Sequence, residues 1–513
     1  MRVARPHHNE AMSALAIAIK GIINLPTGTG KSFIQAGCIA NTIAKDIAMG
    51  IYGVYVVLAP RILLSNQLFA SIKEDLVNSG TDCQYLIDNS GRFTSDMEWV
   101  ASIRELEDGN GLVNREMEST TSPVVIQQYF DKAQREKVPL VIAGTYDSAE
   151  QIQKAGVHVR ELHCDEAHYL VPNIEENTTG FAWIAPDFIA DRKFFYTATM
   201  KFTNGNLGMD SVELFGEVLY QKLPLEMILA GEIVRPRMHL VDVTTFLNMS
   251  VEDQDAAAVV AAFSEHRAML AMESSSYIAP KLLVVAKGSE HLNDIVNHPE
   301  MQQLRHERPN LTLFDISSAY QPRIDGIVVR REVFLKRLQS LTDMDEAIII
   351  HVRILAEGID VPGITGIMPL NNLKKSALLQ TLGRATRLHS QDRSKLYNGS
   401  MLPEELRKFV KPYAWIIIPV YGELGEEIQA TITEIVYELR TFGFNPSEDI
   451  FVKTSKGQFL PVALGTTNPV DKRAAALHEF FGNIDHTIED RDISDLLEKM
   501  SKWTEEEKDN YIF

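Results

Sequence analysis

The sequence predicts an α/β protein with two successive parallel-sheet domains and a small helical region near its C-terminal end. Short apolar runs rich in β-branched residues recur along the chain, and helical stretches separate them. Strands that alternate with helices in this way form parallel sheets that are covered on both faces. The runs fall into two series: 22–25, 54–59, 140–143 and 194–198, then 282–286, 311–314, 347–351 and 414–420.

The segment between the two series sets the domain boundaries that we predict. Gly231 and Pro236 break any periodic pattern in residues 223–243, so we interpret this segment as an interdomain linker. The first domain is then 1–222 and the second domain is 244–422.

Two further segments depart from the alternation of strands and helices. Residues 92–136 are polar and predict an insertion of surface helices and a loop within the first domain. Residues 423–513 are acidic and predict a helical region, because apolar residues recur there at steps of three and four. These residues are Ile428, Ile432, Ile435 and Leu439.

Composition excludes several classes of protein. A chain of 513 residues with 45% apolar and 23% charged residues is typical of soluble globular proteins, which excludes wholesale disorder and fibrous architectures. Cys38, Cys83 and Cys164 lie far apart and form no C-x-x-C pair. This spacing argues against structural zinc or a disulfide scaffold, and it favours a reducing, cytoplasmic compartment, whether a cell or a virus encodes the chain.

Charge and hydropathy limit the partners that we expect. No apolar run reaches the length of about 18 residues that predicts a membrane span. Glu10 and Lys20 interrupt the apolar N-terminal stretch, so we expect no secretory signal there. The net charge of −19 repels phosphate backbones and acidic membrane surfaces. Any nucleic-acid binding therefore requires a local basic groove.

A glycine-rich loop directly follows the first predicted strand and opens a helix. It reads Thr27-Gly28-Thr29-Gly30-Lys31-Ser32. Glycines let backbone amides approach phosphates, and a helix N-terminus favours negative charge. We expect Lys31 to reach the β- and γ-phosphates of ATP and Ser32 to ligate Mg²⁺. Leu25 takes the place of the first glycine in the strict form of this loop, G-x-x-x-x-G-K-[ST].

An acidic pair, Asp165 and Glu166, follows the alternating stretch 159–164 and precedes His168. A carboxylate at a strand end that faces a phosphate loop can hold magnesium, and a second carboxylate can deprotonate the attacking water. We assign the first role to Asp165 and the second to Glu166. Taken alone, the pair also fits a solvated turn, but the phosphate loop favours the catalytic interpretation.

Two arginines, Arg384 and Arg387, are three residues apart and share a face if the segment is helical. Guanidinium groups remain charged and can stabilise a transferring phosphoryl group. Without the other motifs, surface salt bridges would be the preferred interpretation of these two arginines. The other motifs favour the role in phosphoryl transfer.

These motifs resemble those of superfamily 2 helicases and translocases, from Arg5 to Val420. The phosphate loop and Asp165-Glu166-Ala167-His168 match the family's first and second motifs. Three later segments match the third, fifth and sixth motifs in the family's order: 197–199, 357–362 and 380–387.

The resemblance implies two RecA-like domains that close on ATP and Mg²⁺, with the nucleic acid held across both. It implies that His168, Thr197 and Thr199 couple hydrolysis to movement of the nucleic acid. Gly358 and Asp360 are expected to bind the nucleotide. Gln380 is expected to act beside the two arginines.

The chain departs from the family at one place. Many members carry R-P-x-Q before the phosphate loop, and the Gln reads adenine, whereas Arg5 and Pro6 are followed here by His7 and His8. His8 can still make one hydrogen bond to a base, so we keep it as a candidate nucleotide contact. The alternative is a solvated N-terminal turn.

The passage 215–234 resembles that of DNA-directed members, including the motor subunits of type I and type III restriction enzymes and phage-type DNA helicases. We therefore favour DNA over RNA. Contacts are expected just beyond strand ends, where open α/β sheets bind ligands, and they should be to phosphate and sugar. The candidates are Pro60, Arg61, Thr145 and Lys287.

The sequence thus predicts an ATP-dependent nucleic-acid helicase or translocase. Two alternatives remain: an RNA helicase of the same superfamily, or a nucleotide-gated clamp or remodelling subunit that binds a protein partner through 92–136 or the C-terminal region. A nuclease is not expected, because Pro186-Asp187 and the nearby 191–193 are too close together for a PD and D-x-K pair.

Overall fold

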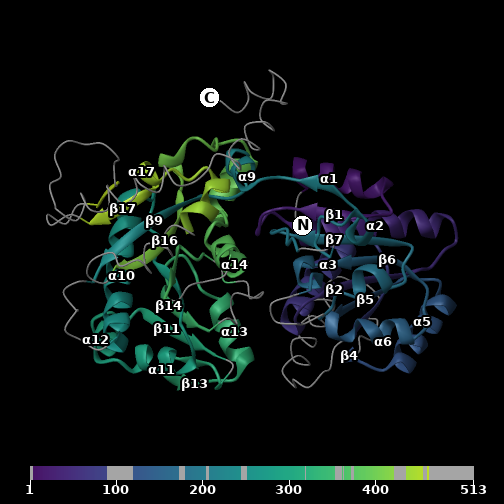
Figure 1. Cartoon of the computed structure of the whole chain (residues 1–513), viewed down its shortest axis with the longest axis horizontal. Helices are drawn as coiled ribbons and strands as arrows, with labels where there is room; N and C mark the ends of the chain where they lie inside the picture. The colour runs from purple at the N-terminus through teal and green to yellow at the C-terminus, as the bar shows by residue number, and fades with distance from the viewer. Residues whose placement is uncertain are drawn as a thin grey trace. The chain divides into compact units, whose positions relative to one another are not determined.

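The computed structural model describes residues 4–88, 119–172, 180–203, 207–243, 251–317, 319–352, 361, 363–370, 375–420, 435–453 and 459–461. The chain divides into two compact units, and the second begins at Leu223. Each unit contains one mostly parallel sheet with helices packed against it (Figure 1). The predicted α/β class is confirmed.

The first sheet has the strand order β4-β3-β5-β2-β6-β7-β1-β8, and all of its recorded pairings are parallel. Its strands are β1 (Lys20–Asn24), β2 (Val54–Ala59), β3 (Gln84–Asp88), β4 (Ser119–Thr120), β5 (Leu140–Thr145), β6 (Val159–Cys164), β7 (Arg192–Thr197) and β8 (Glu217–Gln221). The unit's helices are α1 (Pro6–Ile17), α2 (Lys31–Ala48), α3 (Ile62–Asn78), α5 (Pro123–Glu136), α6 (Ala149–Lys154), α7 (Ile184–Asp187) and α8 (Val212–Phe215), with 3₁₀ turns at Tyr146–Ser148 and Ala167–Leu170.

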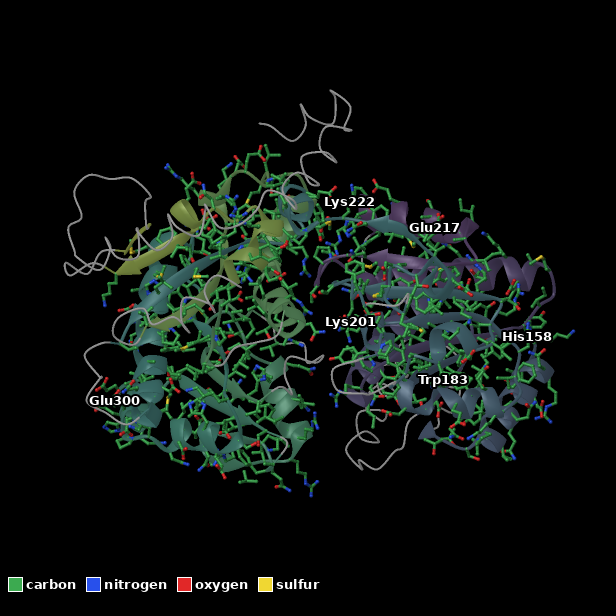
Figure 2. All side chains as sticks on the ribbon, viewed as in Figure 1. His158, Trp183, Lys201, Glu217, Lys222 and Glu300 are labelled. Atoms are coloured by element: carbon green, nitrogen blue, oxygen red, sulfur yellow. The ribbon has the colours of Figure 1, made fainter. Side chains whose placement is uncertain are left out.

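Strand β2 shows why the apolar runs form buried strands. Val54, Val56 and Leu58 belong to a core cluster with residues of α5 and α6. Tyr55 and Val57 belong to a second cluster with residues of α2 and α3. Successive side chains of a strand point to opposite faces, so a strand covered on both faces is apolar throughout. Side chains fill both units in this manner (Figure 2).

The second sheet has the strand order β13-β12-β11-β14-β10-β15-β16-β9-β17-β18. Its strands are β9 (Arg235–Asp242), β10 (Lys281–Val285), β11 (Leu311–Ile316), β12 (Arg323–Ile324), β13 (Ile327–Val328), β14 (Glu346–His351), β15 (Gly366–Pro369), β16 (Tyr413–Val420), β17 (Ile450–Lys453) and β18 (Phe459–Pro461). The unit's helices are α9 (Pro224–Leu229), α10 (Val251–Glu273), α11 (Ser289–Asn297), α12 (Pro299–Glu307), α13 (Arg331–Gln339), α14 (Lys375–Ala385), α15 (Ser390–Tyr397) and α17 (Pro446–Asp449), with 3₁₀ turns at Leu406–Lys408 and Arg440–Phe442.

The segment 223–243 holds more structure than the sequence pattern indicated. It contains α9 and β9, and β9 pairs with β16 and β17. Pro236 is tolerated because it lies near the start of β9, before the pairing with β17 begins at Met238.

The C-terminal region also contributes two strands, β17 and β18, that we did not predict. Residues 435–439 are helical, as expected, and the short helix α17 follows them. Of the predicted insertion, 92–118 lie outside the described residues, and the remainder forms β4 and α5. The domain boundaries stay a prediction.

The described residues also bear on the expectations about membrane spans and cysteines. Among the helices in the described ranges, none combines the length and the apolarity that a membrane span needs. All three cysteines are buried. Cys38 lies in α2, Cys164 is the last residue of β6, and Cys83 directly precedes β3.

Candidate active site

The phosphate loop joins β1 to α2. Gly28 and Gly30 have φ angles of +88° and +92°, which glycine adopts without the strain that other residues incur. A Cβ atom at Gly30 would also lie 2.4 Å from His8 Nε2. Lys31 Nζ donates to the carbonyl of Leu25 at 3.2 Å, so its side chain folds back over the loop. Ser32 is half-buried in the first turn of α2.

The N-terminal turn supports this loop from one side. The carbonyl oxygen of Thr29 accepts from His7 Nε2 at 2.8 Å, His8 Nε2 at 2.9 Å and Arg5 Nη2 at 3.2 Å. The backbone amide of Arg5 donates to His8 Nδ1 at 3.2 Å. Both ring nitrogens of His8 are therefore bonded within the protein. The alternative of a solvated turn is wrong, because His7 and His8 are buried.

Asp165 is held at the end of β6 by three hydrogen bonds. Its backbone amide donates to the carbonyl of Leu58 at 2.8 Å, and its own carbonyl accepts from the Tyr146 hydroxyl at 2.5 Å. Gln35 Nε2 donates to Asp165 Oδ1 at 3.1 Å. Burial and the adjacent charge of Glu166 raise the pKa of the Asp165 carboxyl, and this shift indicates that a nearby cation would stabilise the charged form.

Glu166 and His168 continue from this strand end. Glu166 has a left-handed φ of +50°, which is strained for a residue with a side chain. His168 Nδ1 lies 3.5 Å from Glu166 Oε2 and 3.2 Å from Thr197 Oγ1. The Thr197 hydroxyl donates to the carbonyl of Thr199 at 2.8 Å, so His168 must donate to Thr197 through Nδ1. Burial lowers the pKa of His168 and favours this neutral ring.

The order of the strands brings these groups together. Strand β7, which ends at Thr197, lies between β6 and β1. All three strands are parallel, and Asn24 of β1 pairs with Thr197 of β7. The phosphate loop, the acidic pair and the Thr197 turn therefore lie along one edge of one sheet.

The arginines lie in the second unit. Gln380 and Arg384 belong to α14, but this helix ends at Ala385, so the shared helix face that we predicted for Arg384 and Arg387 is wrong. Arg387 instead forms an isolated bridge with Ile233. The chain leaves the helix because the Thr386 carbonyl accepts from the Val234 amide at 2.8 Å. Arg384 is buried and Arg387 is half-buried.

Lys411 fixes the end of α14. Its Nζ donates to the carbonyls of Ala385 at 2.7 Å and Ile364 at 3.1 Å. Complete burial lowers the pKa of Lys411 to about 7. Sequence reasoning did not find this residue, because its partners lie 26 and 47 positions away.

Comparison with known proteins identifies solved structures that share this fold. No family model and no curated protein matches the sequence. Among solved structures, the chain is similar to the ATP-dependent Type ISP restriction-modification enzyme LlaBIII bound to DNA, with a TM-score of 0.64, 15% identity, and coverage of 95% of this chain and 33% of that chain. The chain has the superfamily 2 helicase-like fold.

Two more structures share this helicase-like fold. A nuclease-deletion mutant of the Type ISP enzyme LlaGI has a TM-score of 0.54 at 15% identity, with coverage of 88% of this chain and 30% of that chain. A fragment of a putative HsdR subunit of a type I restriction enzyme from Vibrio vulnificus YJ016 has a TM-score of 0.50 at 16% identity. The match covers 90% of this chain and 70% of that chain. This chain thus spans about a third of the length of the Type ISP enzymes. The expectation of two RecA-like domains is confirmed.

Within the helicase-like fold, the candidate nucleic-acid residues differ in accessibility. Pro60 and Thr145 are buried at the ends of the paired strands β2 and β5, whereas Arg61 is exposed. Lys287, after β10, pairs with Asp255 Oδ2 at 2.6 Å. Gly358 and Asp360 lie outside the described residues.

The sequence did not predict that Gln35 and Tyr146 contact Asp165. Gln35 lies one helical turn after Lys31, and this spacing was the available signal for its position beside the loop. Tyr146 follows β5, and nothing in its local sequence indicates that it contacts Asp165.

Proposed function

We propose that the protein is an ATP-dependent helicase or translocase that acts on nucleic acid, with DNA as its substrate. One observation carries the proposal: the Lys31 loop, the acidic pair and the His168–Thr197 contact occupy three neighbouring strand ends of one sheet. Nucleotide hydrolysis requires a phosphate site beside carboxylates, and movement requires a link from that site to the rest of the domain.

The loop supplies the phosphate-binding groups. Thr27, Gly28, Thr29 and Gly30 present backbone amides at the N-terminus of α2, and Lys31 supplies the positive charge. Ser32 and Asp165 fit Mg²⁺, because their oxygen atoms are the ligands that this ion prefers. Bound magnesium would neutralise phosphate charge.

Glu166 accepts the proton of the attacking water in this mechanism. His168 and Thr197 pass the resulting change to Thr199 through their hydrogen bonds.

The second domain contributes the remaining groups. Arg384 and Arg387, with Gln380, stabilise charge on the γ-phosphate when the domains close, and Gly358 and Asp360 contact the nucleotide. An arginine that contributes in this way is worth about 10³ to 10⁵ in rate.

DNA is the proposed substrate because LlaBIII is bound to DNA and LlaGI is in complex with a DNA substrate mimic. The exposed residues Arg61 and Lys287 are the phosphate contacts that we propose first, and Pro60 and Thr145 shape the loops beside them.

The test measures ATP hydrolysis by the full chain with single-stranded, duplex and branched DNA and with RNA of equal length. Salt is held constant, because affinity for nucleic acid falls steeply as salt rises. DNA should stimulate hydrolysis more than RNA, and Lys31→Ala should abolish the activity in every condition. Stronger stimulation by RNA would identify an RNA helicase, and no stimulation by either would favour a clamp or remodelling subunit.

A further inference from the structure

Buried polar side chains join helix α2 to strand β6 beneath the phosphate loop. The helix residues lie at steps of four, three and four from Lys31 and so share one helix face. The strand residues alternate along β6 and share the opposing face. We call this set the polar ladder: Gln35, Cys38 and Thr42 of α2, with Glu161, His163 and Asp165 of β6 and its end.

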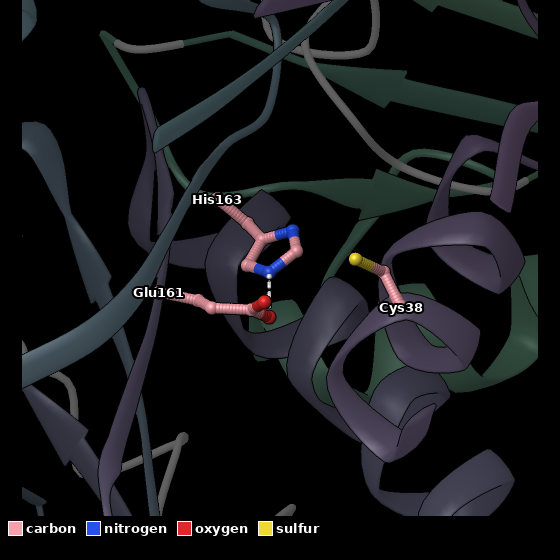
Figure 3. A group of neighbouring side chains, drawn as sticks. All are labelled: Cys38, Glu161 and His163. Carbon is pink, nitrogen blue, oxygen red and sulfur yellow. Dashed lines mark hydrogen bonds and ion pairs between the residues drawn. The ribbon is translucent and has the colours of Figure 1, made fainter. Parts of the chain in front are cut away.

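A hydrogen bond joins α2 to β6 at each end of the polar ladder. At the loop end, Gln35 Nε2 donates to Asp165 Oδ1 at 3.1 Å. At the far end, the Thr42 hydroxyl donates to Glu161 Oε1 at 2.7 Å. Between them, the sulfur of Cys38 faces His163 and Glu161 (Figure 3), and the potential ligand atoms of these three residues lie within 4.8 Å of one another.

Cys38, Glu161 and His163 have the chemistry of metal ligands, but the ligand atoms of Glu161 and His163 already have partners. His163 Nε2 donates to Glu161 Oε2 at 3.1 Å, and its Nδ1 accepts from the Tyr196 hydroxyl at 3.0 Å. Arg192 forms an ion pair with Glu161 Oε1. A metal ion would have to break these bonds beside a guanidinium group, so the hydrogen-bonded arrangement disfavours metal binding here.

Glu161 therefore anchors the far end of the polar ladder. It is fully buried, and a buried carboxylate is stable only when its oxygens are paired and hydrogen-bonded. Thr42, His163 and Arg192 satisfy it from three elements. These bonds hold α2 against β6 and β7 at the end of the ladder that lies away from Asp165.

We propose that Gln35 is a positioning residue for the magnesium-binding carboxylate. Its amide fixes the rotation of the Asp165 side chain, whereas the bonds at the far end of the polar ladder stabilise the packing of α2 on β6. This inference rests on the proposed function, because it assumes that Asp165 meets Mg²⁺. Hydrogen-bonding partners that orient metal ligands typically contribute roughly 10- to 100-fold in metal affinity.

The test compares Gln35→Met with wild type in the full chain. Met keeps the length and the apolar contacts of Gln and removes the amide donor. We would titrate Mg²⁺ at a fixed concentration of a fluorescent ATP analogue and record thermal unfolding in parallel. The half-saturating Mg²⁺ concentration should rise roughly 10- to 100-fold, with little change in nucleotide binding at saturating Mg²⁺.

Thr42→Val is the matched control, because it removes a hydrogen bond from the far end of the same ladder. It should lower the melting temperature and leave the Mg²⁺ midpoint unchanged. Gln35→Asn keeps the amide on a shorter side chain, so it should give an intermediate midpoint and serves if Gln35→Met does not fold. An unchanged midpoint in the folded Gln35 variant, or an equal shift in Thr42→Val, would overturn the inference. Wild-type protein that binds no nucleotide would overturn the proposed function instead.

Discussion

His168 donates through Nδ1 to the hydroxyl of Thr197, 3.2 Å away, and so connects the turn after β6 to the end of β7. The same hydroxyl donates to the Thr199 carbonyl and accepts from the Thr199 amide at 3.1 Å. Each of these bonds fixes the direction of the next, because a hydroxyl has one proton to donate. A displacement of His168 must therefore move the turn that begins at Thr197.

Replacing Thr197 with Val tests this connection. Val keeps the shape and removes the hydroxyl that accepts from His168 Nδ1, and the loss of this buried hydrogen bond costs about 1–3 kcal/mol. We expect ATP hydrolysis to persist while strand displacement or translocation falls severalfold, measured in parallel assays. Thr197→Ser retains the hydroxyl and should keep both activities. Full coupling in the Val variant would contradict the role of this contact.

Glu166→Gln tests the proposed base. The amide matches the carboxylate in shape but cannot accept the proton of water, so the variant should bind nucleotide normally and hydrolyse it orders of magnitude more slowly. Equilibrium binding of a fluorescent ATP analogue and steady-state ATPase assays separate the two effects. A variant that neither binds nor hydrolyses ATP would point to a structural role for Glu166.

Gly30→Ala tests the support of the phosphate loop by His8. The substitution has two costs: an unfavourable positive φ, and a clash of the new Cβ with His8 Nε2. It should therefore break the hydrogen bond from His8 to the Thr29 carbonyl, lower stability and weaken nucleotide binding. Gly50 has a φ of +74° with no atom within 4 Å of an added Cβ, so Gly50→Ala isolates the backbone cost of about 1–2 kcal/mol. Chemical unfolding should show a larger loss for Gly30→Ala. Equal losses would mean that the contact with His8 is unimportant.

Stability should depend on pH through two histidines of the second sheet domain. Burial, with the charge of Arg384, lowers the pKa of His351 to about 3, and burial lowers that of His266 to about 3. Between about pH 6.5 and pH 3 the unfolded chain therefore binds protons that the folded chain does not, so stability is full above this window and falls as pH decreases through it. Each histidine contributes about 1.4 kcal/mol per pH unit.

Denaturant unfolding at pH 7, 6 and 5 measures this dependence. His351→Leu should reduce the slope of unfolding free energy against pH by the contribution of one proton. Carboxylates titrate in both proteins, so the difference between the two slopes isolates His351. Identical slopes would show that His351 does not remain neutral in the folded protein.

The sequence predicted those strands that are apolar along their whole length. It did not predict strands whose polar residues form hydrogen bonds or ion pairs with residues far away in the sequence. The apolar runs at β2 and β5 were found because both of their faces are buried. Strand β9 was not predicted, because Pro236 breaks the pattern and because Arg237 and His239 interrupt the apolar run. Their partners, Glu273 and Glu265, lie on α10, 36 and 26 positions away.

The candidate site divides in the same manner. The phosphate loop and the acidic pair are contiguous motifs whose residue types state their chemistry. The contacts of Gln35 with Asp165 and of His7 with Thr29 were missed, because their partners lie 130 and 22 positions away in the sequence. The order of strands, which a sequence pattern does not specify, supplies those contacts.

The burial of all three cysteines makes the protein suitable for site-specific spectroscopic labelling. Thiol-reactive dyes will find no accessible native sulfur on the folded chain. Cysteines introduced at the exposed positions Glu217 and Asp294, one in each compact unit, will therefore carry a donor and an acceptor fluorophore without background. Energy transfer between the two dyes can then report, in a single native chain and in real time, how the separation of the units changes as nucleotide is added.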